Sequence, residues 1–378
     1  MSPPGAAENR SVGGASAAPP RDASGRAAPA GPVERVCVVL LTGLGDVIHG
    51  LPVVNALKRA WPGVHITWVV EPMPAPVLHG HPSVDDMVVY HKRRGARGVL
   101  DLRRELRRRR FDLTLNLNVY FKSVWPTLLS RAPVRLGFDR GRASDGVWLA
   151  SNRHLPPRPR AHTQDMFLEF LHVLEVDPRP LEWRLAPTAE ERRTQADHFG
   201  RFDRPVAAIV PASANAKKDW LPERWARVVD GLEREHGFVS MIVGGPSARE
   251  RSITDGILAA AASSPLVALG DGIRRLVWLL GGSDLVIAPD TGPVHIARAL
   301  EVPVIGLYGH TNPWRVGPYG RYHDLWIDAY TEPGEPPDPS DFTPKLGRME
   351  TITAEQVLDR VGVAVERYGV RDRTGRRP

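Results

Sequence analysis

The feature of this sequence that most limits its fold is a short, continuously apolar segment that recurs along the chain, usually ahead of a glycine-rich or polar turn. The first example, residues 36–41, is rich in β-branched side chains. Such a run is typical of a strand buried on both faces of a sheet. Amphipathic helical stretches follow several of these segments. Strands that alternate with helices indicate parallel βαβ units, so the sequence predicts an α/β fold.

The predicted elements fall into two series. We expect strands at 36–41, 65–70, 86–90, 113–117, 206–210, 239–243, 266–269, 285–288 and 304–308. We expect helices at 47–60, 99–110 and 222–236, one that ends at 299, and a last one that ends near 367. A chain of 378 residues is longer than one simple core needs. The prediction is therefore two doubly wound, Rossmann-like domains that face a central cleft.

Composition and pattern together suggest the domain boundaries. Residues 1–32 hold nine Ala, six Pro, five Gly and four Ser, which predicts a disordered tail. An organellar transit peptide is the alternative that the arginines of this tail leave open. The two domains are expected at 33–187 and 188–350, and residues 351–378 are expected to form a C-terminal helix and a basic tail.

Several classes of protein are excluded by composition. The single cysteine, Cys37, rules out a disulfide framework and a multi-cysteine metal site. No apolar run reaches the roughly 18–20 residues that cross a bilayer, and we expect a cytoplasmic protein. The sequence also lacks a Walker phosphate loop, a Gly-x-Ser-x-Gly elbow, an Asp-x-Asp pair at a strand end and a His-x-x-x-His pair. We therefore expect no metal site and no cofactor.

The positive charge of the chain is concentrated in one stretch. The formal net charge is +7, and residues 92–110 contain ten Lys or Arg against two acids, a local excess of +8. The rest of the chain therefore sums to about −1. An anionic partner is expected at this stretch, with a solvated helix face as the alternative. No aromatic residue interrupts the stretch, so nucleic acid is not expected as a partner.

The turn after the first predicted strand carries the first candidate site residue. Residues 43–46 read Gly-Leu-Gly-Asp, but Ile48 stands where a dinucleotide fingerprint has its third glycine. Ligands of open parallel sheets bind beyond the carboxyl ends of the strands, so Asp46 is expected to face the cleft. Two interpretations remain open for Asp46. One is an N-cap carboxylate and the other is a functional carboxylate that serves as a general base; the two are not exclusive, but a general base must keep a free oxygen.

The segment 290–295, Asp-Thr-Gly-Pro-Val-His, follows another predicted strand and opens a helix. Gly292 lets a ligand approach the backbone, and a helix start offers free N–H groups to a phosphate. Thr291 adds a hydroxyl, and His295 adds an imidazole one turn later. The alternative is a capped helix with an incidental core histidine.

Two further turns carry candidate residues. The loop 211–220 contains Ser213 and Lys218, which have the chemistry to neutralise a phosphate, although a polar surface loop is the alternative. Glu250 follows the turn after the predicted strand at 239–243, where a carboxylate often holds ribose hydroxyls. The alternative for Glu250 is a solvated surface residue.

Taken together, these motifs resemble glycosyltransferase family 9, the bacterial heptosyltransferases, and especially heptosyltransferase I. The matching segments are 45–52 (GDVIHGLP), 68–71 (WVVE), 122–123 (KS), 218–225 (KDWLPERW), 290–295 (DTGPVH) and positions between 303 and 313. They span most of the chain in a consistent order.

The resemblance implies a GT-B architecture and an inverting, metal-independent transfer of heptose. The donor would be an ADP-heptose, and the acceptor would be the inner core of lipopolysaccharide at the cytoplasmic face of the inner membrane. Asp46 would be the general base. The implied donor-binding residues are Ser213, Lys218, Glu250, Asp290, Thr291, Gly292 and His295. The implied acceptor-binding residues are Gly45, His49, Lys122 and Ser123.

Some residues depart from the family pattern. Asn116 and Asn118 stand where the family has a carboxylate and a glutamine, and Pro293-Val294 replaces the usual pair before the histidine. These departures concern the acceptor and the sugar more than the chemistry. Two alternatives therefore remain, a transferase or 2-epimerase acting on another nucleotide sugar and a binding protein without activity. Contact between the basic stretch and an anionic membrane surface is a further expectation.

Overall fold

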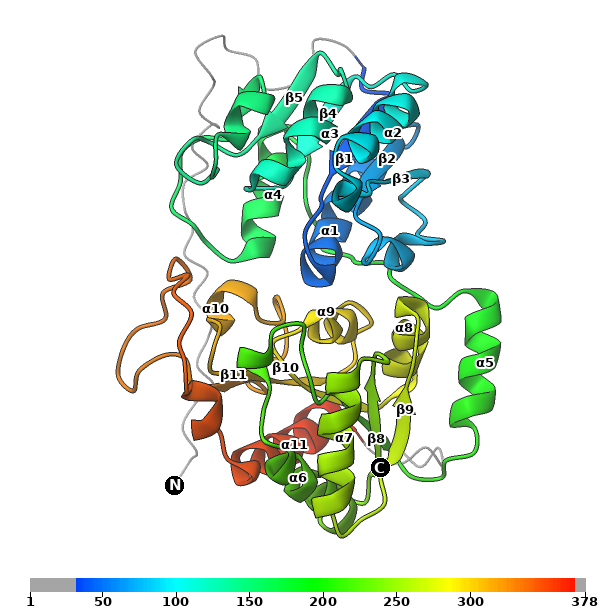
Figure 1. Cartoon of the computed structure of the whole chain (residues 1–378), viewed down its shortest axis with the longest axis vertical. Helices are drawn as coiled ribbons and strands as arrows, with labels where there is room; N and C mark the ends of the chain where they lie inside the picture. Colours follow the sequence, from blue (N-terminus) through cyan, green and yellow to red (C-terminus); the bar gives the residue numbers. More distant parts are fainter. Residues whose placement is uncertain (1–31, 371–378) are drawn as a thin grey trace, which may run out of the picture.

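The computed structural model describes residues 32–370, which form two α/β halves, one above the other in Figure 1. The first half holds strands β1 (Arg35–Val39), β2 (His65–Val70), β3 (Asp86–Val89), β4 (Leu113–Asn116), β5 (Val134–Gly137) and β6 (Arg153–His154). The second half holds β7 (Val206–Ile209), β8 (Val239–Gly244), β9 (Leu266–Leu269), β10 (Leu285–Pro289), β11 (Val304–Tyr308) and β12 (Ile327–Asp328). All pairings within both sheets are parallel. The α/β prediction is confirmed.

The two sheets share one strand order. It is β3-β2-β1-β4-β5-β6 in the first half and β12-β11-β10-β7-β8-β9 in the second. Counted within each half, both orders read 3-2-1-4-5-6, the order of a doubly wound dinucleotide-binding domain. Such a sheet binds its ligand where the strand order reverses, between the first and fourth strands. The expected ligand positions are therefore the turns after β1 and β4 and the turns after β7 and β10.

Helices cover both sheets. They are α1 (Leu44–Ala60), α2 (Ala96–Arg107), α3 (Val124–Leu129), α4 (Thr163–Val173), α5 (Ala189–Phe199), α6 (Pro222–Arg234), α7 (Ala248–Ala260), α8 (Ile273–Gly282), α9 (Gly292–Ala299), α10 (Pro313–Val316) and α11 (Ala354–Tyr368). Along β1, Val36 and Val38 join the apolar cluster that contains α1 and α4, whereas Cys37 and Val39 join the cluster that contains α2. This alternation explains why the predicted strand is apolar throughout.

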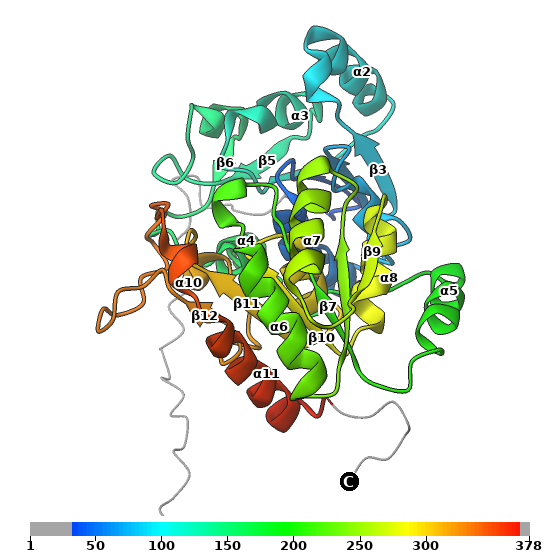
Figure 2. The ribbon, with the colours of Figure 1, turned by 60° about the horizontal axis from the view of Figure 1, so that its bottom comes forward.

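Several predicted elements differ from the observed ones at their boundaries, and nine α-helices and strands observed in residues 32–370 were not predicted: α3, α4, α5, α7, α8, α10, β5, β6 and β12. The first strand ends at Val39, and α1 begins at Leu44, three residues earlier than expected. The basic helix α2 begins and ends three residues earlier than expected. The final helix, α11, packs against α6 of the second half, and Figure 2 shows the two helices side by side. They lie so close that a Cβ on Gly231 of α6 would be 2.5 Å from Leu358 of α11. The domain boundaries at 187 and 350 stay predictions, and the predicted tail lies, except for residue 32, outside the described residues.

The two halves touch where α1 crosses α9. A Cβ on Gly45 of α1 would lie 2.6 Å from the Cδ2 atom of His295, and a Cβ on Gly292 of α9 would lie 2.8 Å from the Cδ2 atom of Leu44. Real Cβ atoms do not approach other atoms so closely, so both positions need glycine. The first turns of two helices, one from each half, are thereby held against each other. None of the helices in residues 32–370 is long and apolar enough to span a membrane.

Candidate functional site

The α1–α9 crossing gathers most of the predicted site residues. Asp46 and His49 belong to α1, and Thr291, Gly292 and His295 belong to the start of α9. Lys218 approaches from the turn after β7 and Asp290 from the end of β10. Lys122 approaches from the turn after β4. These turns are the ones that the reversal of strand order selects in each half.

Asp46 is not the N-cap of its helix, so the N-cap interpretation is wrong. Gly43 holds the N-cap position, and Asp46 is the third residue of α1. The prediction failed because the helix begins at Leu44, three residues before the predicted first residue, Val47. Asp46 is half-buried, and its carboxylate has no hydrogen bond or ion pair with any residue between 32 and 370. A carboxylate at the positive end of a helix, with both oxygens free, has the position that a proton acceptor needs.

Three buried histidines fill the space beside Asp46. The ring centroid of His49 lies 4.6 Å from that of His295 and 5.5 Å from that of His162, which precedes α4. Burial lowers the pKa of all three imidazoles, and that of His162 falls to about 3. The negative charges of Asp46 and Asp290 oppose this effect at His49 without reversing it. The cluster is therefore neutral at pH 7.

Hydrogen bonds hold two of these rings in place. His49 Nδ1 lies 3.1 Å from Gln164 Oε1, and Gln164 Nε2 donates to the backbone oxygen of His49 at 2.9 Å. His162 Nδ1 accepts from the backbone N–H of Gln164, and His162 Nε2 lies 3.1 Å from the backbone oxygen of Gly317 in the other half. His49 Nε2 and His295 Nδ1 are buried without a partner in the described part of the chain. His162 and Gln164 were not predicted as site residues, because neither belongs to a recognisable motif.

The turn after β7 directs a cation at the start of α9. Lys218 lies on a short 3-10 helix, η5 (Ala216–Lys218), and its Nζ is 2.5 Å from Asp290 Oδ2. Asp290 is buried and Lys218 is half-buried. An ammonium has three donors, and within residues 32–370 only Asp290 accepts one of them. The remaining two donors of Lys218 are available to an anion.

Thr291 and Gly292 form the start of α9. Thr291 is the N-cap residue but makes no side-chain capping bond. Its hydroxyl and the first backbone N–H groups of α9 are thus open to a ligand, as in other anion-binding helix starts. Ser213 lies nearby in the same loop as Lys218, where its Oγ donates to the backbone oxygen of Asn215 at 2.7 Å. Ser213 therefore shapes the loop in addition to any contact with a ligand.

Lys122 lies on the other side of Asp46. It belongs to the 3-10 helix η3 (Phe121–Ser123), and its Nζ donates to the backbone oxygen of Leu41 at 2.6 Å and lies 3.3 Å from Glu71 Oε1. Burial lowers the pKa of Lys122, although the charges of Glu71 and Asp46 act against this. Ser123 is buried, and its Oγ donates to the backbone oxygen of Tyr120 at 3.1 Å.

Asn118, one of the residues that depart from the family pattern, has a structural role. Its Oδ1 accepts from the backbone N–H of Leu41 at 3.1 Å, and its Nδ2 donates to the backbone oxygen of Val39 at 2.8 Å. These bonds tie the turn after β4 to the turn after β1. Asn118 therefore supports the backbone that leads to Asp46.

Glu250 has a structural partner, Ser247, that was not predicted. It is the third residue of α7 and forms a capping box with Ser247. Its Oε1 accepts from the backbone N–H of Gly245 at 2.7 Å, and its Oε2 accepts from Ser247 Oγ at 2.6 Å. The Ser-x-x-Glu pattern at 247–250 was the available signal. Contact between Glu250 and a ribose stays a prediction.

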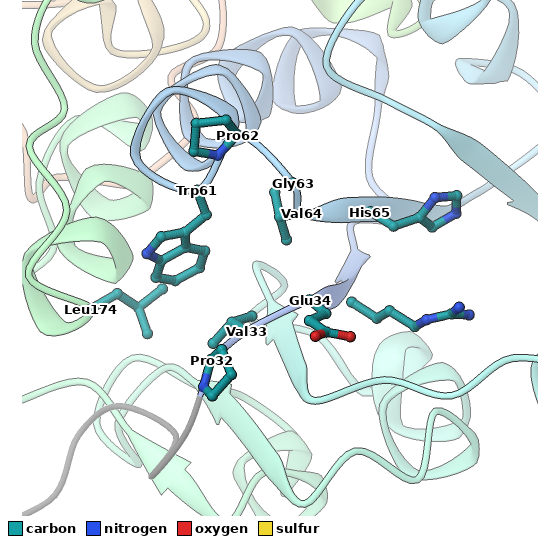
Figure 3. A pocket seen from close by; sticks show the side chains of 10 residues that line it. Pro32, Val33, Glu34, Trp61, Pro62, Gly63, Val64, His65 and Leu174 are labelled. Carbon is teal, nitrogen blue, oxygen red and sulfur yellow. The ribbon is translucent and has the colours of Figure 1, made fainter.

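Of two further cavities, one lies away from this site and the other borders the histidine cluster through His162. Figure 3 shows a pocket of about 670 Å³ lined by residues 32–35, 61–65 and Leu174. It lies at the amino ends of β1 and β2, opposite the ligand-binding edge of the sheet. A groove of about 1150 Å³ runs between α4 and segment 314–326, and Arg298 at the end of α9 also lines it. Neither cavity contains a predicted site residue. Within residues 32–370, no group of three His, Cys, Asp or Glu side chains is arranged to hold a metal ion.

Solved structures define the class of this fold. The chain is similar to a glycosyltransferase of family 9 from Veillonella parvula, with a TM-score of 0.73, 24% identity, and coverage of 88% of this chain and 97% of that one. It is also similar to the heptosyltransferase WaaC of Escherichia coli with ADP, with a TM-score of 0.67, 22% identity, and coverage of 88% of this chain and 98% of that one. Two Rossmann-like domains that meet at their ligand-binding edges thus form the GT-B architecture, as predicted.

The chain belongs to glycosyltransferase family 9 (heptosyltransferase), whose family model matches residues 99–332. It is 31% identical to the lipopolysaccharide core heptosyltransferase OpsX of Haemophilus influenzae, over 87% of this chain and 95% of that protein. The predicted family is confirmed, and the protein is a glycosyltransferase.

Proposed function

We propose that this protein transfers a heptose from an ADP-heptose to the inner core of lipopolysaccharide, with inversion at the anomeric carbon and without a metal ion. The observation that supports the proposal most is the α1–α9 crossing. Asp46 follows one of the two glycines at which the helices touch, and Thr291 precedes the other. The contact between α1 and α9 thus brings a candidate proton acceptor from one domain, Asp46, close to a candidate anion-binding helix start from the other, that of α9. The names of the relatives supply the sugar and the acceptor.

In the proposed reaction, Asp46 accepts the proton of an acceptor hydroxyl. The acceptor oxygen forms a bond to the anomeric carbon of heptose on the face opposite the diphosphate, and the bond between that carbon and the diphosphate oxygen breaks. ADP leaves with the electron pair. Asp46 suits the role of base because no described residue occupies its carboxylate.

The leaving diphosphate gains negative charge as the bond breaks. We propose that two free donors of Lys218, the Thr291 hydroxyl and the first N–H groups of α9 stabilise this charge, with Asp290 holding Lys218 in position. Ser213, Gly292 and His295 are proposed to line the same donor site, and Glu250 is proposed to contact the ribose. These groups supply the electrostatic stabilisation that a metal ion provides in other transferases.

The acceptor is proposed to approach from the side of Lys122 and Ser123, next to Gly45 and His49. The ring of His49 is buried against α4 and α9 and lies within hydrogen-bond distance of Gln164. Its proposed role is therefore to hold α1, and with it Asp46, in position. An acceptor of this kind is anchored in a membrane, so the protein is proposed to act in the cytoplasm at the inner face of the inner membrane.

The first experiment measures nucleotide binding and transfer in the same samples. Calorimetric titration of the full chain with ADP, UDP, GDP and NAD, in buffer containing EDTA, should show binding of ADP alone. Transfer from ADP-heptose to a deacylated inner-core acceptor, followed by mass spectrometry and by NMR of the new glycosidic bond, should give one inverted product. Preference for UDP or GDP would contradict heptose as the sugar.

Two variants test the residue roles. Asp46→Asn should lower kcat by about 10²- to 10⁴-fold, the usual contribution of a general base, and should keep ADP binding. Lys218→Gln should weaken ADP binding by about tenfold or more. The matched controls are Asp197→Asn, at an exposed position of α5, and Lys217→Gln, at the exposed position next to Lys218, and both should resemble the wild type in both assays. Wild-type turnover by Asp46→Asn would remove Asp46 as the base.

A further inference from the structure

An exposed apolar surface lies on the N-terminal domain. Its side chains come from η3, α3 and a further 3-10 helix, η4 (Val147–Ala150), which packs against both. The exposed fractions of the side chains are large: Tyr120 50%, Phe121 53%, Trp125 45%, Leu128 41% and Leu149 68%. We call these five residues the apolar patch. Side chains of this size are usually buried, so a cluster of them in contact with water indicates an interaction surface.

The spacing of the patch residues puts them on one face. Phe121, Trp125 and Leu128 are four and three residues apart along the helical segment 121–129, and helical residues at these spacings are neighbours on the surface. The inward face of the same segment is filled by buried Ser123, Pro126 and Thr127. The patch is therefore an outer face that no described part of the chain covers.

Positive charge borders the patch. Helix α2 packs beside α3, and Figure 2 shows both helices at the end of the N-terminal domain farthest from α11. Arg103, Arg107 and Arg108 of the α2 region and Arg131 after α3 are exposed, and none of them forms an ion pair with another residue between 32 and 370. Large apolar and aromatic side chains suit the interfacial layer of a bilayer, and unpaired arginines suit its anionic headgroups. The surface therefore has the chemistry to bind an anionic lipid surface.

The patch begins next to the candidate acceptor side of the site. Phe121 directly precedes Lys122, whose Nζ contacts the backbone of Leu41, and the charge of Asp46 acts on that amine. A bilayer in contact with the patch would therefore adjoin the entrance through which a membrane-anchored acceptor must reach Asp46.

We propose that the apolar patch and the adjoining arginines of α2 dock the enzyme onto an anionic bilayer. The rings of Trp125 and Tyr120 and the side chains of Leu128 and Leu149 enter the interfacial layer, and the arginines bind lipid phosphates. This inference rests on the proposed function for its biological purpose, but the docking itself is independent of substrate.

The test is co-sedimentation of the full chain with vesicles of phosphatidylcholine that contain about one third phosphatidylglycerol, and with vesicles of phosphatidylcholine alone. The wild type should bind the anionic vesicles at least tenfold more tightly, and added salt should weaken this binding. The pair Trp125→Ser with Leu128→Ser should lower the affinity at least tenfold, and so should the pair Arg103→Glu with Arg107→Glu.

Matched controls come from the C-terminal domain. The pair Leu258→Ser with Leu346→Ser also replaces exposed leucines, and the pair Arg193→Glu with Arg251→Glu reverses the same charge. Both should bind vesicles like the wild type. All variants should transfer heptose to a deacylated, soluble acceptor at the wild-type rate, which shows that they fold.

The outcomes separate the two proposals. If the patch variants bind vesicles as tightly as the wild type, or if the wild type binds no vesicles, the docking surface is refuted. The docking surface is also refuted if the wild type is a dimer in solution and the pair Trp125→Ser with Leu128→Ser converts it to a monomer. The patch would then join two copies of the chain. Absence of heptose transfer by the wild type to the soluble acceptor would refute the proposed function and leave the vesicle result standing.

Discussion

The buried histidine cluster predicts a loss of stability in mild acid. His162 combines two features, a pKa lowered to about 3 by burial and a position as the N-cap of α4. Since its Nδ1 accepts the N–H of Gln164, the proton of the neutral ring is on Nε2, which faces the Gly317 backbone oxygen. A second proton would go to Nδ1 and would break the capping bond.

The size of the effect follows from the difference between the folded and unfolded states. An unfolded histidine binds a proton below about pH 6.5, whereas His162 in the folded protein binds one only near pH 3. The unfolded state therefore takes up more protons between these values, and the free energy of unfolding falls as the pH falls through this window. From pH 6.5 to pH 5 the loss is about 1.4 kcal/mol per pH unit, or about 2 kcal/mol for His162 alone.

The variant His162→Asn isolates this contribution. Asparagine is a good N-cap residue, so it keeps an acceptor for the Gln164 N–H and removes the titrating ring. Urea unfolding at pH 7.5 and at pH 5 should show that the variant loses about 2 kcal/mol less than the wild type between the two values. His172→Asn, at an exposed position of the same helix, should lose as much as the wild type. Equal losses in wild type and His162→Asn would show that His162 is not held neutral by burial.

Two further substitutions test packing, one at the α1–α9 crossing and one at a buried ion-pair cluster next to α4. Gly45→Ala should lower the free energy of unfolding by about 1–3 kcal/mol, because its Cβ would lie 2.6 Å from His295. The control Gly43→Ala has open space around its Cβ and should leave the free energy of unfolding nearly unchanged. Thermal and urea unfolding measure the stability of both variants. Arg142 is buried and forms ion pairs with the buried carboxylates of Asp139 and Glu169. Arg142→Met should lower the free energy of unfolding, measured with urea, by about 3–5 kcal/mol, because both carboxylates lose their partner. The exposed Arg140→Met is the control for Arg142, and equal midpoints for the two would contradict the importance of the buried ion pairs.

The fold was predictable where apolar runs were long and continuous. The strands at 65–70, 266–269 and 304–308 have the predicted bounds. The missed strands β6 and β12 have only two residues each, and so short a pairing leaves no periodicity in the sequence. The missed strand β5 has four residues, but its sequence Val-Arg-Leu-Gly contains an arginine and a glycine and so forms no apolar run. The missed helix α5 exposes most of its side chains, so it lacks an apolar stripe; its Thr188–Glu191 capping box was the signal that remained.

The site was predictable as a set of turns but not as a set of contacts. The rule that ligands lie beyond the carboxyl ends of strands selected the turns that carry Asp46, Lys218 and Thr291. The ion pair of Lys218 with Asp290 joins residues 72 positions apart, and His162 reaches the cluster from another helix. The first contact depends on the pairing of β7 with β10 in the second sheet, and the second depends on the packing of α4 against α1 in the first domain. Local sequence patterns carry no information about either placement.

The reciprocal contacts of Gly45 with His295 and of Gly292 with Leu44 restrict how the two domains can move. If α1 slid along α9 by one residue, about 1.5 Å, a side chain would come to the place that Gly45 now leaves open for the imidazole. Turning about the crossing moves neither glycine out of its contact. We therefore expect the crossing to act as a pivot, with the distance between Asp46 and the first turn of α9 changing least if the domains rotate. The outer parts of both domains can open to exchange substrates while the two reacting ends of the site stay in register.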